Sequence, residues 1–212
     1  MSPHSKRIGA VILAAGGSSR FGEPKQLIRF RGKTLLRRTI DAASEAGCSP
    51  VVVVVRSYDE NIHCHLDRAG VVTVQNAQWQ RGIGSSIRCG IQGLTNNSPD
   101  VEASVLLVCD QPAVGLGVIE CLIALHETTG KCIVASSYAN TLGVPALFTR
   151  CVFEELLSLD DNAGAKSIVL RSRGRVASFA FPEGQIDIDT WEDWEKQLKL
   201  TTKRRRVPSL GG

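Results

Sequence analysis

Small residues followed by two cations stand at the end of an apolar run. The run, residues 8–13, stops at Ala14-Ala15-Gly16-Gly17-Ser18, and Arg20 and Lys25 follow. Because small residues leave room around the backbone, the N–H groups of such a turn can approach a ligand closely. The two cations complement a polyphosphate. Neither G-x-G-x-x-G nor G-x-x-x-x-G-K-[ST] occurs, so the segment predicts a nucleoside triphosphate site rather than a dinucleotide or P-loop site.

An acidic residue ends a second apolar run, residues 105–109, and Pro112 follows it. Pro112 cannot donate a ladder hydrogen bond, so the strand should stop near Asp110. In an open α/β sheet, ligands bind beyond the carboxyl ends of the strands, which puts Asp110 at the same edge as the Gly16 turn. A carboxylate and a triphosphate repel each other. Mg²⁺ held by one or two carboxylates would offset this repulsion and allow Asp110 to face the phosphates. The alternative is a turn-forming Asp before Pro, without a metal.

Another acidic segment covers residues 185–193. Asp187 and Asp189 alternate, so both would face the same side of a short strand and suit a shared cation. Asp189 and Thr190 also suit the N-terminus of a helix, where such side chains accept hydrogen bonds from the free backbone N–H groups. We therefore assign Asp187 to the metal and Asp189 or Thr190 to helix capping.

Small and hydroxylated residues open another expected helix, within residues 79–88. Gly82, Ser85 and Ser86 stand where free N–H donors of a helix N-terminus can bind anionic or sugar groups. The alternative is ordinary N-capping by Ser85 or Ser86.

The elements that position these residues alternate along the chain. Strands are expected over residues 8–13, 51–55, 71–75, 104–109, 131–136, 146–148, 175–181 and 185–188. Helices are expected over residues 34–46, 58–68, 85–94, 117–128, 152–157, 165–170 and 192–200. This alternation predicts an α/β fold: a three-layer, mostly parallel sheet with helices on both faces. We expect one domain over residues 1–200.

Composition limits the remaining functions. The chain has 212 residues and a net charge of +4, which residues 203–206 account for alone. Residues 201–212 are therefore expected to form a disordered basic tail, and the near-neutral domain is not expected to bind nucleic acid. No apolar run is long enough to span a membrane and no signal peptide is seen, so we expect no membrane partner and a cytoplasmic location. The seven cysteines show no C-x-x-C and are interpreted as free thiols.

The first motif also carries a family resemblance. Residues 13–26 resemble the signature L-A-A-G-x-S-x-R-[FM]-G-x-x-K of nucleotidyltransferases, and are most similar to the molybdenum cofactor cytidylyltransferase group. The likeness covers residues 8–200 and five motifs. The other four are Cys109-Asp-Gln-Pro, the 185–193 and 79–88 segments, and Gly143-Val-Pro-Ala-Leu-Phe148 with residues 160–166. It implies a nucleotide-diphospho-sugar transferase-like, Rossmann-like fold.

The resemblance implies a reaction and its residues. CMP would pass from CTP to the terminal phosphate of molybdopterin with release of pyrophosphate, and Mg²⁺ would be the cofactor, held by Asp110 and Asp187. The catalytic residues would be Arg20, Lys25 and Asp110. The nucleotide would contact Leu13, Ala14, Ala15, Gly16, Gly17, Ser18, Arg20, Lys25, Gly82, Ser85 and Ser86. The acceptor would contact Gly143, Pro145 and Lys166.

Departures from the family pattern leave alternatives open. Asp161, Asn162 and Lys166 stand where the family has Gly, Asp and Arg, and Lys lacks the bidentate fork of Arg. The acceptor could therefore be another phosphorylated molecule, such as a sugar phosphate, or the enzyme could use GTP. A non-catalytic molybdenum cofactor-binding chaperone is the rival of a different class. The expected partners are CTP and a molybdopterin-type acceptor, with hand-over to a molybdoenzyme as a further possibility.

Overall fold

A computed structural model describes residues 7–17, 24–56, 62, 66, 70–188 and 190–196. Several predictions fall outside these residues: Ser18, Arg20, Asp189, the tail over 201–212 and most of the helix expected over 58–68. No helix in the described part of the chain is long and apolar enough to cross a membrane. The cytoplasmic location stays a prediction.

A seven-stranded sheet organises the chain, in the order β5-β4-β1-β6-β8-β7-β9. Within it β8 runs antiparallel to its neighbours and the other pairs are parallel, so the predicted mostly parallel sheet is confirmed. The strands are β1 (Ile8–Leu13), β4 (Val51–Val55), β5 (Val71–Gln75), β6 (Ala103–Val108), β7 (Ile133–Tyr138), β8 (Thr141–Thr149) and β9 (Val176–Ala180).

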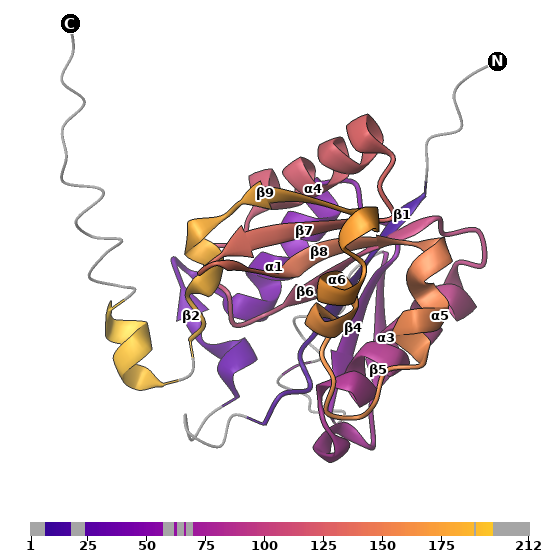
Figure 1. Ribbon diagram of the computed structural model, residues 1–212. Helices are drawn as coiled ribbons and strands as arrows, with labels where there is room; N and C mark the ends of the chain where they lie inside the picture. The colour runs from indigo at the N-terminus through magenta and orange to yellow at the C-terminus, as the bar shows by residue number, and fades with distance from the viewer. Residues whose placement is uncertain are drawn as a thin grey trace, which may run out of the picture.

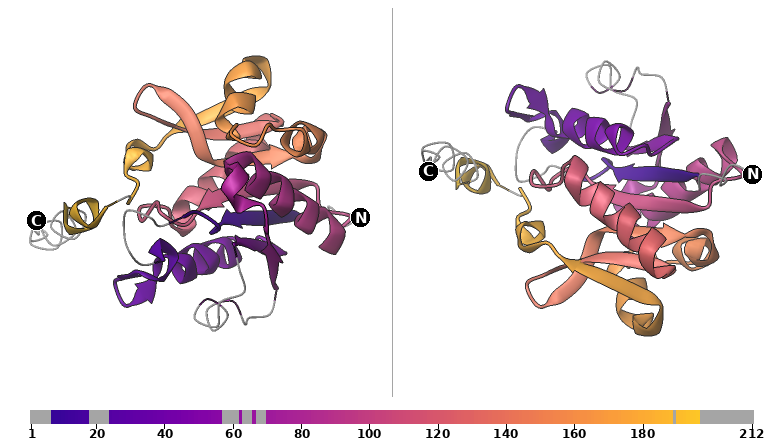
Figure 2. Two further views of the ribbon diagram at one scale, coloured as in Figure 1. Left: turned by 90° about the horizontal axis from the view of Figure 1, so that it is seen from below. Right: turned by 90° about the horizontal axis from the view of Figure 1, so that it is seen from above.

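Helices cover both faces of the sheet (Figure 1, Figure 2), which confirms the predicted three layers. One hydrophobic core lies beneath α1 (Leu35–Glu45) and α4 (Leu116–Thr129). The other lies beneath α3 (Ile83–Asn97), α5 (Phe153–Leu157) and α6 (Lys166–Arg171). Alternate residues of each central strand enter opposite cores, which explains why the apolar runs of β1 and β4 are unbroken.

Glycines bring α3 close to the sheet. A Cβ atom at Gly90 would strike the side chain of Val11, and one at Gly93 would strike that of Val74. The two glycines lower helix propensity but permit this approach. The helix predicted over 85–94 therefore forms, and it extends to residues 83–97.

Of two predicted strands in the back third, one is longer than predicted and one is wrong. The strand expected over 146–148 forms as part of the nine-residue β8, which pairs with both β6 and β7 after a turn at Ala139 and Asn140. The strand expected over 185–188 does not form. Pro182–Gln185 is a 3-10 helix instead, and Ile188 makes a single backbone bond to the carbonyl oxygen of Asp110. A proline at the first helical position favours this local helix.

A small third core holds the C-terminal segment against a hairpin, β2 (Arg29–Phe30) and β3 (Lys33–Thr34), which the sequence analysis did not anticipate. Its members are Ile28, Phe30, Leu35, Ile188 and Trp194. The rings of Phe30 and Trp194 meet edge to face at 5.4 Å.

The final described helix, over residues 191–196, begins with a reciprocal cap. The N–H of Asp193 donates to Thr190 Oγ1, and the Asp193 carboxylate accepts from the N–H of Thr190. The predicted capping role is thus confirmed for Thr190.

Candidate active site

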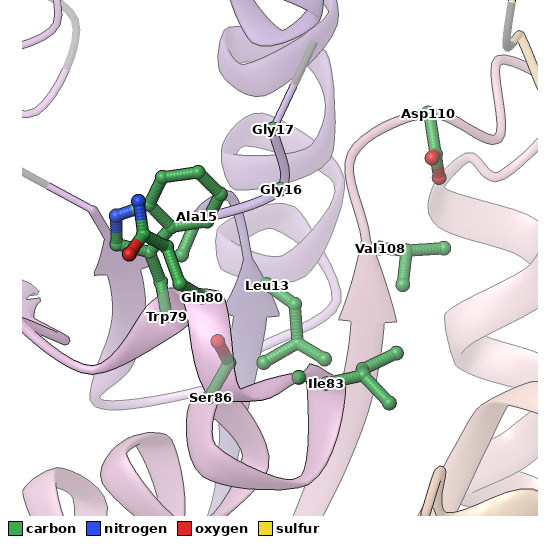
Figure 3. Close-up of a pocket in the computed structure, with 11 residues that line it drawn as sticks. Leu13, Ala15, Gly16, Gly17, Trp79, Gln80, Ile83, Ser86, Val108 and Asp110 are labelled. Carbon is green, nitrogen blue, oxygen red and sulfur yellow. The ribbon is translucent and has the colours of Figure 1, made fainter. Parts of the chain in front are cut away.

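A pocket of about 320 Å³ opens at the edge where β1 and β6 end (Figure 3). Trp79 and Gln80 lie on one side of it, and Val108 and Asp110 on the other. The lining consists of Leu13, Ala15, Gly16, Gly17, Trp79, Gln80, Gly82, Ile83, Ser86, Val108 and Asp110. The pocket therefore lies at the carboxyl edge of the sheet, as expected for an open α/β fold.

Most described residues assigned to the nucleotide line this pocket. The exceptions are Ala14 and Ser85, which are buried, and Lys25, which pairs with the lining residue Asp110. Ser18 and Arg20 lie outside the described residues. Trp79, Gln80, Ile83 and Val108 were not among the predicted site residues, although the first three stand within the quoted 79–88 motif.

Glycine allows the loop after β1 to lie against an aromatic ring. A Cβ atom at Gly17 would come within 2.9 Å of Trp79 Cζ3, so a larger residue would displace the ring or the loop. The Trp79 ring also has the Arg56 guanidinium 5.8 Å from its centroid. At Gly16 no described atom lies within 4 Å of the position that a Cβ atom would take, so the backbone there has room for a ligand.

Asn76 fixes the start of α3. Its Nδ2 donates to Ser85 Oγ at 2.9 Å and to Ser86 Oγ at 3.0 Å, while Ser85 Oγ donates to the Gly82 carbonyl oxygen at 2.8 Å. The helix begins at Ile83 with Gly82 as its N-cap, so neither serine is the cap, and that alternative is wrong. Ser86 instead presents its side chain to the pocket.

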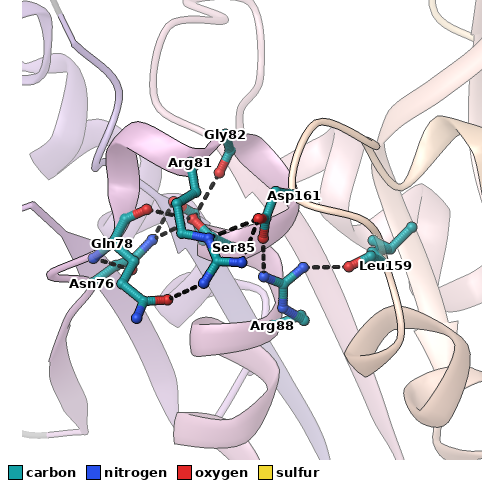
Figure 4. A network of polar contacts seen from close by, with 9 residues as sticks. Asn76, Gln78, Arg81, Gly82, Ser85, Arg88, Leu159 and Asp161 are labelled. Carbon is teal, nitrogen blue, oxygen red and sulfur yellow. Dashed lines mark hydrogen bonds and ion pairs between the residues drawn. The ribbon is translucent and has the colours of Figure 1, made fainter.

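An arginine–aspartate network holds a distant loop against the same helix start (Figure 4). Arg81 Nε donates to Asp161 Oδ2 at 2.7 Å, and the Arg88 guanidinium contacts both Asp161 Oδ1 and the Leu159 carbonyl oxygen. These arginines, with the Arg88 hydrogen bond first, lower the pKa of Asp161. Asp161 departs from the family pattern, and its bonds to Arg81 and Arg88 hold its loop against the start of α3.

Close backbone packing completes this junction. The N–H of Gly84 donates to the Asp161 carbonyl oxygen at 2.8 Å. A Cβ atom at Gly84 would collide with the carbonyl oxygen of Asp160.

Gly84→Ala is therefore expected to lower the free energy of unfolding by about 1–3 kcal/mol, because the added methyl group overpacks the junction. Urea denaturation measures the change. Gly117→Ala is the matched control, since Gly117 also lies in a helix and no described atom stands within 4 Å of its Cβ position. The control should change stability by less than about 1 kcal/mol. Equal effects of the two substitutions would contradict the packing argument.

Lys25 forms an ion pair with Asp110, which lines the pocket. Lys25 Nζ lies 3.2 Å from Asp110 Oδ2, and the two side chains are 15% and 27% exposed. Lys25 begins a 3-10 helix, Lys25–Leu27, and the following Ile28 anchors this helix in the third core. The pair is partly shielded from solvent, so its charges act on each other and on a ligand more strongly than surface charges do.

Asp187 reaches the same edge of the sheet without belonging to a strand. The next residue, Ile188, is fully buried in the third core, and its N–H donates to the Asp110 carbonyl oxygen at 3.0 Å. Burial and, second, the Asp187 charge raise the pKa of Tyr138, the last residue of β7. The Asp187 backbone therefore lies close to that of Asp110 at this edge of the sheet, and carboxylates are ligands that a divalent cation such as Mg²⁺ takes from proteins. Among the described residues, no group of three or more His, Cys, Asp or Glu side chains forms a metal cluster.

The three residues assigned to the acceptor do not meet. Gly143 and Pro145 are buried in β8, while Lys166 is exposed at the start of α6. Their role stays a prediction. A second pocket, of about 450 Å³, opens beside the β7–β8 turn. It is lined by Ser137, Asn140, Thr141, Leu142, Leu170, Arg173, Val176 and Ser178.

Comparisons with known proteins agree with this geometry. The sequence model of the MobA-like NTP transferase domain family matches residues 10–176. The bifunctional protein GlmU of Pelobacter propionicus is 30% identical over 131 residues, which make up 60% of this chain and 28% of that protein. The chain thus spans little more than a quarter of GlmU. The nicotine blue oxidoreductase of Paenarthrobacter nicotinovorans is 27% identical over 144 residues, covering 68% of this chain and 67% of that protein.

A solved structure matches almost the whole chain. The crystal structure of Rv0371c from Mycobacterium tuberculosis H37Rv superposes with a TM-score of 0.76 and 30% identity, covering 93% of this chain and all of that one. A structure of the same protein in complex with manganese superposes with a TM-score of 0.71 and 29% identity, covering 92% of this chain and 99% of that one.

Proposed function

The chain belongs to the MobA-like NTP transferase domain family and is a nucleotidyltransferase, and from this premise we propose that it transfers CMP from CTP to the terminal phosphate of molybdopterin. The observation that carries the proposal is the ion pair of Lys25 with Asp110, a residue of the pocket that Ala15–Gly17 also line. Cation, carboxylate and open backbone amides together match a nucleoside triphosphate with its metal.

In the proposed complex the nucleotide lies in the 320 Å³ pocket, whose volume falls within the range of small-molecule sites. The backbone N–H groups of Ala15–Gly17 face the base and the phosphates. The Trp79 ring and the Gln80 amide line the far side from Asp110, where they can contact the base or the ribose. Lys25 stands at the phosphate end, with Arg20 as the predicted second cation.

The metal is proposed to be Mg²⁺, with Asp110 and Asp187 as its protein ligands. Two carboxylates at one edge of the sheet provide the hard oxygen ligands that Mg²⁺ prefers, and Mg²⁺ usually takes only one or two from the protein. The manganese complex of Rv0371c supports a divalent ion in a protein of this fold. When bound, the ion would neutralise oxygens of the α- and β-phosphates.

The proposed reaction is an in-line displacement. An oxygen of the acceptor phosphate attacks the α-phosphorus of CTP, a new phosphorus–oxygen bond forms, and the bond to the bridging oxygen breaks as pyrophosphate leaves. The nucleophile is already ionised, so no general base is required. Positioning and charge neutralisation are the main catalytic demands, and Lys25 and Arg20 are the residues assigned to them.

The choice of CTP and molybdopterin rests on the motif resemblance. Leu13-Ala-Ala-Gly is typical of the cytidylyl group, whereas guanylyl relatives usually show L-A-G-G. The alternative is a nucleotidyltransferase acting on another phosphorylated acceptor. The non-catalytic chaperone is disfavoured because such a protein would not need the Lys25–Asp110 pair.

Pyrophosphate release tests the proposal directly. We expect release only when CTP, Mg²⁺ and molybdopterin are all present. Faster release with GTP or UTP would overturn the base assignment, and release with a sugar phosphate but not with molybdopterin would overturn the acceptor. Molybdopterin binding without release under any condition would favour the chaperone.

We further propose the second pocket for the acceptor. It lies on the same face of the sheet as the nucleotide pocket, because Leu142 and Val176 pack on the same core as Leu13 and Val108. Arg173 supplies a cation beside the hydroxyl groups of Ser137, Thr141 and Ser178, which suits a phosphorylated polar molecule.

Arg173→Gln is accordingly expected to raise the KM for the acceptor by about 10–100-fold and leave that for CTP within twofold, since a charge-assisted bond contributes about 1.5–3 kcal/mol. Steady-state kinetics measure both. Arg171→Gln is the control, because Arg171 pairs with Glu155 and does not line the pocket. An unchanged acceptor KM in Arg173→Gln would refute this placement.

The third core should support the metal site through Ile188. Ile188→Ala is expected to lower the free energy of unfolding by about 2–5 kcal/mol and metal affinity in the presence of CTP by about 10–100-fold, because Asp187 loses its anchor. Ile168→Ala is the control, since Ile168 lies on α6 and is equally buried, but in another core. It should lose similar stability but keep its metal affinity, as measured by manganese titration. Equal metal affinities in the two variants would contradict the anchoring role.

A further inference from the structure

Two cysteines lie together at the edge of the sheet where β1 begins, opposite the nucleotide pocket. Cys132 directly precedes β7, and Cys151 follows β8 in a 3-10 helix, Arg150–Val152. The antiparallel pairing of β7 with β8 sets Ile133 opposite Phe148, so Cys132 comes beside Thr149, two residues before Cys151.

Thr149 bridges the two cysteines. Its N–H and its Oγ1 both donate to the Cys132 carbonyl oxygen, at 2.9 Å and 3.1 Å, and Oγ1 also lies 3.1 Å from Cys151 Sγ. The Cys151 thiol also acts on the thiol of Cys132 and raises its pKa. The two cysteines are therefore neighbours across the β7–β8 strand pair, with Thr149 in contact with both.

The surroundings suit thiol–disulfide exchange. Cys151 is exposed and Cys132 half-buried, so small molecules can reach the pair. The Arg175 guanidinium interacts electrostatically with both cysteines and also pairs with Glu155. The interaction with Cys151 and, second, burial raise the pKa of Cys132. Cys151 is the more exposed of the two, so it offers the attacking sulfur.

The other described thiols differ from this pair. Burial raises the pKa values of Cys48 and Cys109 to about 12. Burial also raises that of half-buried Cys89. Cys121 is exposed on α4, so it provides an internal control for exposure alone.

We propose that Cys132 and Cys151 form a reversible disulfide in response to a disulfide oxidant such as oxidised glutathione, at a site independent of nucleotide transfer. The Cys151 thiolate attacks one sulfur of the oxidant, a mixed disulfide forms, and one glutathione thiolate leaves. Cys132 loses its proton and attacks Cys151 Sγ, which releases the second glutathione. Two protein thiols are thereby oxidised and one glutathione disulfide is reduced to two thiols.

The bond would tie the start of β7 to the end of β8. Because it closes a loop of about 20 residues, it would limit the freedom of the unfolded chain and stabilise the fold. We expect the melting temperature to rise by about 5 °C on oxidation.

Mass spectrometry of the full chain after treatment with oxidised glutathione tests the proposal. The expected product has lost two hydrogens, and proteolysis should yield a linked peptide pair containing Cys132 and Cys151. Dithiothreitol should restore both thiols to alkylation. In Cys132→Ser the reaction should stop at a glutathione adduct on Cys151, whereas Cys121→Ser should still form the bond.

Three results would overturn the inference. The first is a wild-type chain whose Cys151 keeps its glutathione adduct, since Cys132 would then be out of reach. The second is full alkylation of both Cys132 and Cys151 after a treatment in which the oxidant does modify Cys121, since the pair would then be no more reactive than an exposed thiol. The third is a linked peptide that joins either cysteine to a residue other than its proposed partner.

Discussion

Replacing Lys25 with alanine is expected to lower kcat by about 10²–10³-fold while leaving the fold intact. A preorganised charge aimed at a transition state contributes about 2.7–4 kcal/mol, which is the basis of this estimate. Lys25 Nζ already lies 3.2 Å from Oδ2 of the pocket residue Asp110, so the amine is held beside the proposed phosphate site. Steady-state pyrophosphate release at saturating CTP measures kcat.

The stability of Lys25→Ala separates a catalytic role from a structural one. Both side chains of the Lys25–Asp110 pair keep some contact with solvent, so removing Lys25 should cost less than the roughly 3–5 kcal/mol of breaking a fully buried pair. The melting temperature should therefore fall by only a few degrees. Lys33→Ala is the matched control, because Lys33 also pairs with an aspartate, but its partner Asp41 does not line the pocket whereas Asp110 does. If Lys25→Ala retained wild-type kcat, the assignment of Lys25 to phosphate would be wrong.

The central strand β4 could be predicted from sequence because it is buried on both faces. Val51–Val55 forms a strand with the predicted bounds, since a continuous β-branched run suits a sheet covered on both faces. Val71–Gln75 also has the predicted bounds, although it is the half-buried edge strand β5. The length of β8 was underestimated, since only residues 146–148 were predicted as a strand. Gly143 and Pro145 interrupt its apolar pattern, and the preceding turn places Ala139 at a φ of 46° without any glycine.

The pocket residues that could be predicted are those whose position follows from their own segment of the chain. Ala15–Gly17 and Asp110 follow strands directly, so strand ends locate them. Trp79 and Gln80 come from a 3-10 helix, Trp79–Arg81, whose contact with the β1 loop depends on long-range packing. No local pattern specifies such a contact.

Asp187 illustrates the same limit. The alternation with Asp189 predicted a strand that does not form. Asp187 nevertheless reaches the edge of the sheet, because Ile188 packs with Phe30 and Trp194, and Phe30 is distant from it in sequence. The third core, which no local sequence pattern indicates, therefore places Asp187 at the sheet edge in the absence of the predicted strand.

Replacing Asp110 with asparagine is expected to lower kcat by about 10³-fold or more and to abolish the dependence of activity on a divalent metal. Asparagine preserves the shape of the side chain but removes the anionic charge that attracts Mg²⁺. The loss of several kcal/mol of metal-assisted charge stabilisation corresponds to at least this factor. Activity titrated with Mg²⁺ and Mn²⁺ is the measurement. Asp100→Asn is the control, since Asp100 pairs with Arg7 in an exposed contact.

Asparagine is the informative replacement because it separates the two interpretations of Asp110. Asn forms turns about as readily as Asp, so a purely turn-forming Asp110 would tolerate the change with activity intact. A metal ligand would not. The Lys25–Asp110 contact adds a second criterion, since residues that act on one phosphate–metal unit give non-additive effects. The double variant Lys25→Ala/Asp110→Asn should therefore be little worse than Asp110→Asn alone, and fully additive losses would show that the two residues act independently.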